Sequence, residues 1–161
     1  MKVLLTTPPY SLEDRYGKKL KHFGGDAEPL GLAYIAAAVR HINHYVEVID
    51  APVQNFTSEM IAQKAKEEKF DIVGITGFTP AYSRIKATVE ALQKILPKLI
   101  IIIGGPHGSI LPEETIEDLN IDFIVIGEGE NTIKELLTTI ECKGNFHDVK
   151  GICFKENVQI S

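Results

Sequence analysis

Five short apolar runs, each followed by a stretch with helical spacing, restrict the fold of this chain more than any other feature of its sequence. The runs lie at residues 2–7, 45–50, 71–76, 99–104 and 122–127. Most of them are nearly continuous in Ile, Val and Leu, which is typical of parallel strands that are buried on both faces. This repeated strand–helix order predicts a doubly wound α/β sheet with helices on both sides.

The stretches between the runs predict the helices. Apolar residues recur at helical spacing in segments that also carry capping residues and prolines at their ends. The expected helices span residues 30–42, 57–69, 82–96, 112–119 and 132–141. Five such units favour the flavodoxin-like (Rossmann-like) strand order 2-1-3-4-5. The segment VKGICFKENVQI (149–160) predicts a C-terminal β-hairpin with its turn near Glu156-Asn157.

Length, charge and cysteine content narrow the class of protein. The 161 residues suit one domain, expected over residues 1–161, and the absence of a stop signal at Ile160-Ser161 indicates a domain of a longer protein. A net charge of -5 disfavours nucleic-acid binding, which needs clustered Lys and Arg. No apolar run approaches the ~20 residues of a membrane span. Two separated cysteines and no signal peptide favour a cytoplasmic location.

Glycine and small hydroxyl residues gather where the predicted strands end. Three of these ends read TGFT (76–79), GGPHG (104–108) and GEGE (127–130). Because the ligands of such sheets bind at the carboxyl ends of the strands, we expect a ligand site at this edge. Tight turns also use glycine, but three glycine-bearing ends on adjacent strands favour binding.

The same strand ends argue against three familiar ligand classes. The acidic pocket, the Asp and the Lys of a receiver-domain phosphorylation site are all missing. The first strand ends in TTPPY (6–10), where two prolines lack the donors that a flavin phosphate needs. The stretch GEGENT (127–132) half resembles a dinucleotide fingerprint. However, it lacks the third glycine and places Glu128 and Glu130 where a pyrophosphate would bind.

Six stretches carry a resemblance to a known family. They are PPYS (8–11), EPLGLAYIAAAVR (28–40), VEVIDA (46–51), FDIVGIT (70–76), IIIGGPHGSILPEE (101–114) and DFIVIGEGENTIKEL (122–136). In this order they resemble the N-terminal cobalamin-binding domain of cobalamin-dependent radical S-adenosylmethionine enzymes. The nearest group includes the anaerobic magnesium-protoporphyrin monomethyl ester cyclase. GGPH, followed by PEE and then GEGE, is the most specific part of the match.

The resemblance implies a cobalamin bound in the base-off state, with the corrin ring over the strand ends and the nucleotide tail inside the domain. Thr76-Gly77-Phe78 stands where the family has Ser-x-Leu, and Gly104-Gly105 stands where it has Gly-Gly. The cofactor-binding residues that it implies are Thr76, Gly77, Phe78, Gly104, Gly105, Pro106, His107, Gly127, Glu128, Gly129, Pro29, Leu30 and Gly31. For His107, capping of the following turn is an equally good interpretation.

Two motifs of related enzymes are missing. The loop at residues 10–28 contains His22 without the Asp-x-His-x-x-Gly pattern whose histidine ligates cobalt in cobalamin-dependent mutases, so we do not expect His22 to be a ligand. The CxxxCxxC motif of a [4Fe–4S] cluster is also absent, so the cluster and S-adenosylmethionine are expected in a downstream radical S-adenosylmethionine barrel domain. No catalytic residue is expected in this chain.

Two functions therefore stand side by side. The chain is either the cobalamin-binding module of a methyltransferase or oxidoreductase, or a non-catalytic binding or sensory module that has lost the cobalamin. Retention of a corrinoid by the purified chain would discriminate between them.

Overall fold

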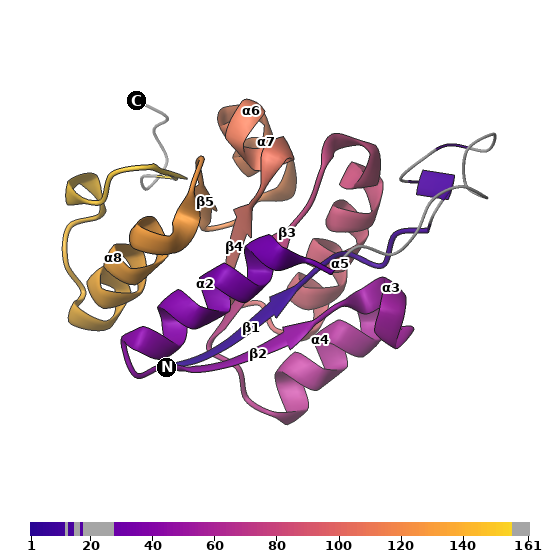
Figure 1. Ribbon diagram of the computed structural model, residues 1–161, viewed down its shortest axis with the longest axis horizontal. Coiled ribbons are helices and arrows are strands. Elements are labelled where there is room, and N and C mark those ends of the chain that lie inside the picture. The colour runs from indigo at the N-terminus through magenta and orange to yellow at the C-terminus, as the bar shows by residue number, and fades with distance from the viewer. Residues whose placement is uncertain (12, 15–16, 18–27, 156–161) are drawn as a thin grey trace.

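A computed structural model describes residues 1–11, 13–14, 17 and 28–155, and its centre is one twisted sheet (Figure 1). The strand order is β2-β1-β3-β4-β5-β6. The strands are β1 (Lys2–Thr6), β2 (Tyr45–Ile49), β3 (Ile72–Thr76), β4 (Ile100–Gly104), β5 (Phe123–Val125) and β6 (Ile152–Phe154). The first five strands pair in parallel, which confirms the doubly wound α/β sheet and the order 2-1-3-4-5.

The sixth strand is an antiparallel edge. Ile152 pairs with Val125, and Phe154 pairs with Phe123. The C-terminal segment thus adds a strand to the main sheet, at the place where the first strand of the predicted hairpin was expected. The turn predicted at Glu156-Asn157 lies outside the described residues.

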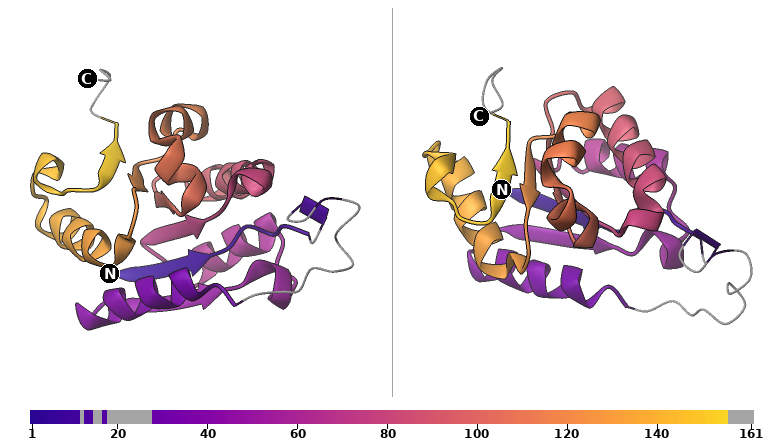
Figure 2. Two further views of the ribbon diagram at one scale, coloured as in Figure 1. Left: turned by 45° about the horizontal axis from the view of Figure 1, so that its top comes forward. Right: turned by 90° about the horizontal axis from the view of Figure 1, so that it is seen from above.

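Among the longer helices that the structure describes, two cover one face of the sheet and three cover the other (Figure 2). The first pair is α2 (Leu30–His41) and α8 (Gly129–Cys142). The opposite layer is α4 (Ser58–Glu67), α5 (Tyr82–Ile95) and α7 (Pro112–Leu119). Shorter elements complete the chain: α3 (Ala51–Gln54), η1 (Thr79–Ala81), α6 (Pro106–Ile110) and η2 (Phe146–Asp148).

Two helices differ from the prediction at the edge where the site was expected. A short helix, α6, begins at Pro106, since the fixed backbone angle of proline suits a first helical turn. Helix α8 begins at Gly129 rather than at residue 132. Glycine is a poor helix former, but here a Cβ atom would lie only 2.8 Å from Ile35 Cδ1. Close packing between α8 and α2 therefore decides this helix start.

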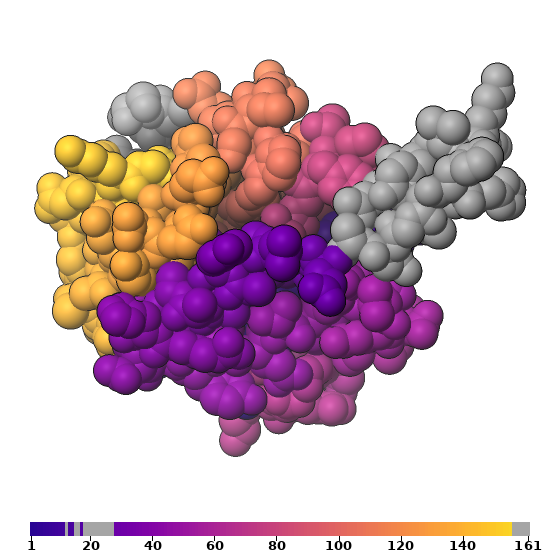
Figure 3. All heavy atoms as spheres, viewed as in Figure 1, coloured from indigo at the N-terminus to yellow at the C-terminus, as the bar shows by residue number. Residues whose placement is uncertain are grey.

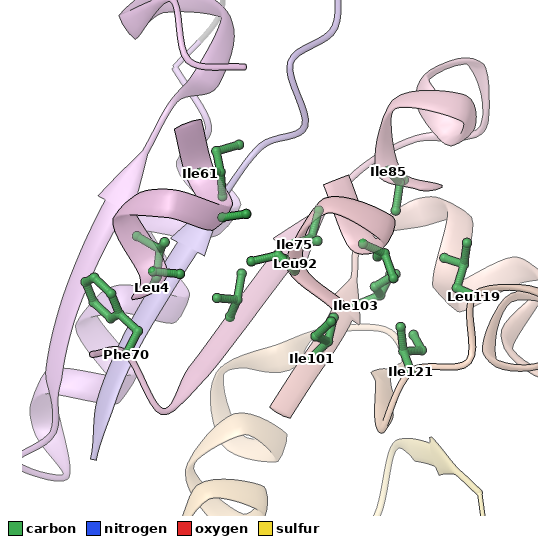
Figure 4. Packing of buried hydrophobic residues seen from close by; sticks show 14 of the residues in the cluster. Leu4, Ile61, Phe70, Ile75, Ile85, Leu92, Ile101, Ile103, Leu119 and Ile121 are labelled. Atoms are coloured by element: carbon green, nitrogen blue, oxygen red, sulfur yellow. The ribbon is translucent and has the colours of Figure 1, made fainter. Parts of the chain in front are cut away.

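The larger core lies under α4, α5 and α7 (Figure 4). Leu4, Ile75 and Ile103 point from the sheet into this layer, and they share one core cluster with Ile85 and Leu92 of α5. All five are at most 3% exposed. Each such side chain contributes roughly 1.5–3 kcal/mol to stability through burial, so this face holds the sheet rigidly.

The second core lies under α2 and α8 and is less complete. Val3, Leu5, Ile72 and Ile102 point into it from three central strands. Between Leu5 and Ile102, however, the corresponding position of β3 is Gly74, which has no side chain. The gap begins a cavity between this face of the sheet and its two helices.

Candidate functional site

A cavity of about 150 Å³ lies between the sheet and helices α2 and α8. Val3, Leu5, Ile72, Gly74 and Ile102 form its sheet side. Residues at the carboxyl ends of β3 and β4 and at the start of α8 form its mouth. Figure 3 shows the surface recessed between the first turns of α2, the start of α8 and the α6–α7 segment. The ligand site expected at the carboxyl edge thus coincides with a real cavity.

The pairing register explains the shape of this cavity. Leu5 is the neighbour of Gly74, and Gly74 is the neighbour of Ile102, so all three positions form one row across the sheet. The next row toward the mouth pairs Thr76 with Gly104. The cavity extends from Thr76 down to Ile72, which is about 13 Å at ~3.3 Å per residue. Glycines in two successive rows therefore open a narrow, deep slot.

Gly74 is a residue that the sequence interpretation missed. It lies in the middle of β3 between Val73 and Ile75, both buried. A Cβ atom at this position would lie 2.7 Å from Leu5 Cδ2, so even alanine would displace Leu5. A glycine inside an otherwise β-branched strand often marks the close approach of a ligand, and this signal was present in DIVGIT.

The two neighbouring glycines at the end of β4 are required for different physical reasons. Gly105 has a φ of 86°, and its Cβ would lie 2.6 Å from Thr76 Oγ1 and 3.0 Å from the Gly77 carbonyl oxygen. The packing of the protein itself therefore requires glycine at 105. At Gly104 the nearest atom to an added Cβ, the Val125 carbonyl oxygen, is 4.0 Å away. A side chain would fit at 104, so its absence serves to keep the cavity open.

Polar groups are confined to the mouth of the cavity. Thr76, Glu128 and Glu130 line it there, and the N–H of Gly127 donates to Ser109 Oγ at 3.0 Å. Thr76 is half-buried at the mouth, and within the described part of the chain its hydroxyl makes no hydrogen bond. The deeper walls are apolar.

Seven of the predicted residues line the cavity. They are Gly31, Thr76, Gly104, Gly105, Gly127, Glu128 and Gly129. The others lie nearby but outside it: Pro29, Leu30, Gly77, Phe78, Pro106 and His107. Pro29 and Leu30 border a separate depression beside Asp50, whereas a Cβ on Gly77 would meet Ile85 of the opposite core at 2.6 Å. Phe78 packs edge-on against Tyr10, with ring centroids 5.2 Å apart.

His107 is buried against α5. Its ring lies 4.3 Å from the ring of Tyr82, its Nδ1 is 3.2 Å from Thr79 Oγ1, and its backbone N–H donates to the Gly77 carbonyl at 3.3 Å. Desolvation lowers the pKa of His107, so the neutral imidazole is favoured. The pKa of Tyr82 lies well above its usual range, mainly because the hydroxyl is buried and also because it donates a hydrogen bond to Asp118. In this geometry His107 anchors α6 to α5.

The volume and the apolar lining of the cavity indicate what kind of group it can hold. A cavity of about 150 Å³ lined by aliphatic side chains is large enough to take up one small aromatic ring. Cobalamin ends in dimethylbenzimidazole, whose two fused rings are larger than one small ring, and Gly104, with no atom closer than 4.0 Å to its Cβ position, leaves space for more of it toward the mouth. The aliphatic lining is therefore chemically compatible with an apolar base.

Metal ligation by the described residues is a separate question. Within residues 1–11, 13–14, 17 and 28–155, no three His, Cys, Asp or Glu side chains gather closely enough to hold a metal ion. His22 lies outside this part of the chain.

Among the described helices, none is long and apolar enough to cross a membrane.

The fold and cavity together define a class: flavodoxin-like domains with a ligand slot at the carboxyl edge. The radical S-adenosylmethionine methyltransferase TsrM from Kitasatospora setae, solved with cobalamin and a [4Fe–4S] cluster bound, has a similar fold. Its TM-score is 0.78 at 18% identity, and the match covers 98% of this chain and 28% of TsrM.

Comparison with curated sequences identifies a methyltransferase and a cyclase as relatives of this chain. An uncharacterized methyltransferase of Pyrococcus horikoshii is 34% identical over 161 residues, covering 99% of this chain and 34% of that protein. The anaerobic magnesium-protoporphyrin IX monomethyl ester cyclase of Synechocystis is 30% identical over 168 residues, covering 99% of this chain and 32% of that protein. This chain thus spans about a third of the length of these relatives.

The profile of the B12 binding domain matches residues 20–137, and the chain belongs to this family. It is a B12-binding domain whose sequence is similar to part of a methyltransferase and to part of the cyclase.

Proposed function

We propose that this chain binds cobalamin in the base-off state, with the nucleotide tail inside the cavity between the sheet and helices α2 and α8. The corrin ring then lies over the carboxyl ends of β3 and β4. Bound in this way, cobalamin supplies a cobalt centre suited to methyl transfer or to radical oxidation.

The observation that carries this proposal is the pair of glycine rows in the cavity. Gly74 and Gly104 lie on the face toward α2 and α8, and both line the slot. A strand in a buried sheet loses packing wherever it carries glycine, so two such positions need a compensating reason. At Gly74, Leu5 already fills the Cβ position, but at Gly104 the space is open, and a ring held there would supply the missing contacts.

The mouth supplies complementary polar groups. The Thr76 hydroxyl can donate to an oxygen of the nucleotide tail, and the carboxylates of Glu128 and Glu130 can accept from the amide side chains of the corrin. On the α2 side of the mouth, Gly31 has no side chain, and no other atom lies within 4 Å of its Cβ position. The ligand can thus enter without rearrangement of the helix.

We further propose that the chain is the N-terminal module of a longer radical S-adenosylmethionine enzyme. Both curated relatives above extend well beyond the matched segment, because this chain covers only 34% and 32% of their lengths. The [4Fe–4S] cluster and S-adenosylmethionine then belong to a downstream domain. A methyltransferase and an oxidative cyclase are the two candidate activities.

Retention of cobalamin tests the binding proposal. The purified chain is mixed with methylcobalamin and desalted, and the absorption spectrum of the protein fraction is recorded. We expect retained corrinoid, with a spectrum that matches free methylcobalamin in acid, where the base has left cobalt. A retained spectrum that matches the neutral form would exclude the base-off state. A colourless protein fraction would favour a module that has lost its cofactor.

A further inference from the structure

The side chains at the deep end of the cavity determine which corrinoids can bind there. We propose that the cavity selects a lower base whose leading edge carries no hydrogen-bonding groups, such as a benzimidazole, over a purine. This inference rests on the proposed function, because it assumes that the nucleotide tail enters the slot.

The side chains at the deep end are aliphatic. Val3, Leu5, Ile72 and Ile102 form its sheet side, and Ile133 of α8 contributes from the helix side. Each of the five is at most 4% exposed. A ring at this depth meets methyl and methylene groups on both of its faces.

The backbone at the deep end offers no polar partner either. β1 lies between β2 and β3, β3 lies between β1 and β4, and β4 lies between β3 and β5. Ladder hydrogen bonds on both sides therefore occupy the N–H and C=O groups of Leu5, Gly74 and Ile102. Ile35 of α2 and Ile133 of α8 lie beyond the first turns of their helices, so helical hydrogen bonds occupy their backbone N–H and C=O groups.

The polar groups at the mouth are too far away to help. Thr76 lies two residues beyond Gly74 along β3, which is about 7 Å at ~3.3 Å per residue. A hydrogen bond needs donor and acceptor within about 3.2 Å. Since the base is joined to its ribose at the mouth side, its far edge points toward the deep end and away from Thr76, Glu128 and Glu130.

The consequence differs between the two classes of base. The far edge of dimethylbenzimidazole is made of C–H and methyl groups, which suit an aliphatic wall. The far edge of adenine carries an amino group and a ring nitrogen, which would lose water and gain no partner. Each unpaired group weakens binding by roughly tenfold or more, and apolar pockets reject a single added polar group by on the order of a hundredfold.

Three corrinoids test this inference through their dissociation constants for the chain of residues 1–161, measured by absorbance titration. They are hydroxocobalamin, the cobamide with adenine as lower base, and cobinamide, which lacks the nucleotide tail. We expect hydroxocobalamin to bind at least about tenfold more tightly than the adenine cobamide and more tightly than cobinamide.

Each contrary result has a distinct meaning. Equal or tighter binding of the adenine cobamide overturns the base selectivity and leaves cobalamin binding intact. Cobinamide binding as tightly as hydroxocobalamin shows that the tail contributes nothing, and so overturns both the selectivity and the placement of the tail in the cavity, while corrinoid binding itself stands. If none of the three binds, the proposed function itself fails.

A matched pair of variants links selectivity to the deep end. Val3→Thr puts a hydroxyl beside the ring with little change of shape, and it should narrow the affinity ratio of the two cobamides. Val46 is the neighbour of Val3 in the sheet and also belongs to the core under α2 and α8, but it does not line the cavity. Val46→Thr should leave the ratio unchanged. An unchanged ratio in a folded Val3→Thr protein would place selectivity elsewhere.

Discussion

Substitution of Gly104 offers the sharpest perturbation of the cavity. The backbone at Gly104 is not in the left-handed region, and the nearest atom to an added Cβ is 4.0 Å away. A side chain at this position can therefore point into the empty slot without straining the fold. A series from alanine to leucine would fill the cavity in steps.

The expected magnitude follows from burial. Each buried carbon contributes about 0.8 kcal/mol, so a leucine side chain with four carbons gains about 3 kcal/mol by filling the cavity. A ligand that needs the same space must expel the side chain and forfeit that gain. At about 1.4 kcal/mol per tenfold, Gly104→Ala should weaken cobalamin binding about fourfold and Gly104→Leu about 200-fold.

Two measurements on the same proteins test this series. Absorbance titration with hydroxocobalamin gives the dissociation constants, and thermal unfolding gives Tm. We expect affinity to fall in the order Gly, Ala, Leu while Tm stays equal or rises. Unchanged affinity in Gly104→Leu, with Tm unchanged or higher, would refute the reasoning, because the tail could not then occupy the cavity.

Three further changes probe neighbouring residues. Gly105→Ala should lower the unfolding free energy by more than about 1 kcal/mol in urea denaturation, because of its φ of 86° and the contact with Thr76 Oγ1; a protein as stable as the parent would contradict this. Thr76→Val should weaken cobalamin binding about fivefold through loss of one hydrogen bond of ~1 kcal/mol, and an unchanged titration would exclude that bond. Desolvation lowers the pKa of His107 in the folded chain, so the unfolded chain binds more protons as the pH falls. The midpoint of urea unfolding should therefore decrease from pH 7 to pH 5. His107→Phe should reduce this drop in the urea midpoint, and an equal drop would show that His107 does not contribute.

The sheet was predictable from the sequence because burial on both faces leaves a continuous apolar run. The run IIIIG, for example, gives β4 almost to the residue. The short helix α6 was not predictable in the same way. Its five residues, PHGSI, are too few to show an apolar period, and its start depends on Gly105 and Pro106 together.

The position of the cavity was predictable from the sequence, but its detail was not. The carboxyl edge and its glycines follow from the strand ends, and seven of the expected residues line the cavity. Gly74 was missed because the face it occupies is known only from the register with Leu5 and Ile102. The different roles of Gly104 and Gly105 depend on backbone angles and Cβ distances, which a pair of identical letters cannot reveal.

Isoleucine methyl NMR tests the location of the tail most directly. Ile102 and Ile133 line the cavity, whereas Ile61 and Ile85 belong to the core on the opposite face of the sheet. On titration with hydroxocobalamin, an aromatic ring in the slot should shift the methyl resonances of Ile102 and Ile133 strongly and those of Ile61 and Ile85 little. Saturable binding that leaves Ile102 and Ile133 unshifted would contradict the account.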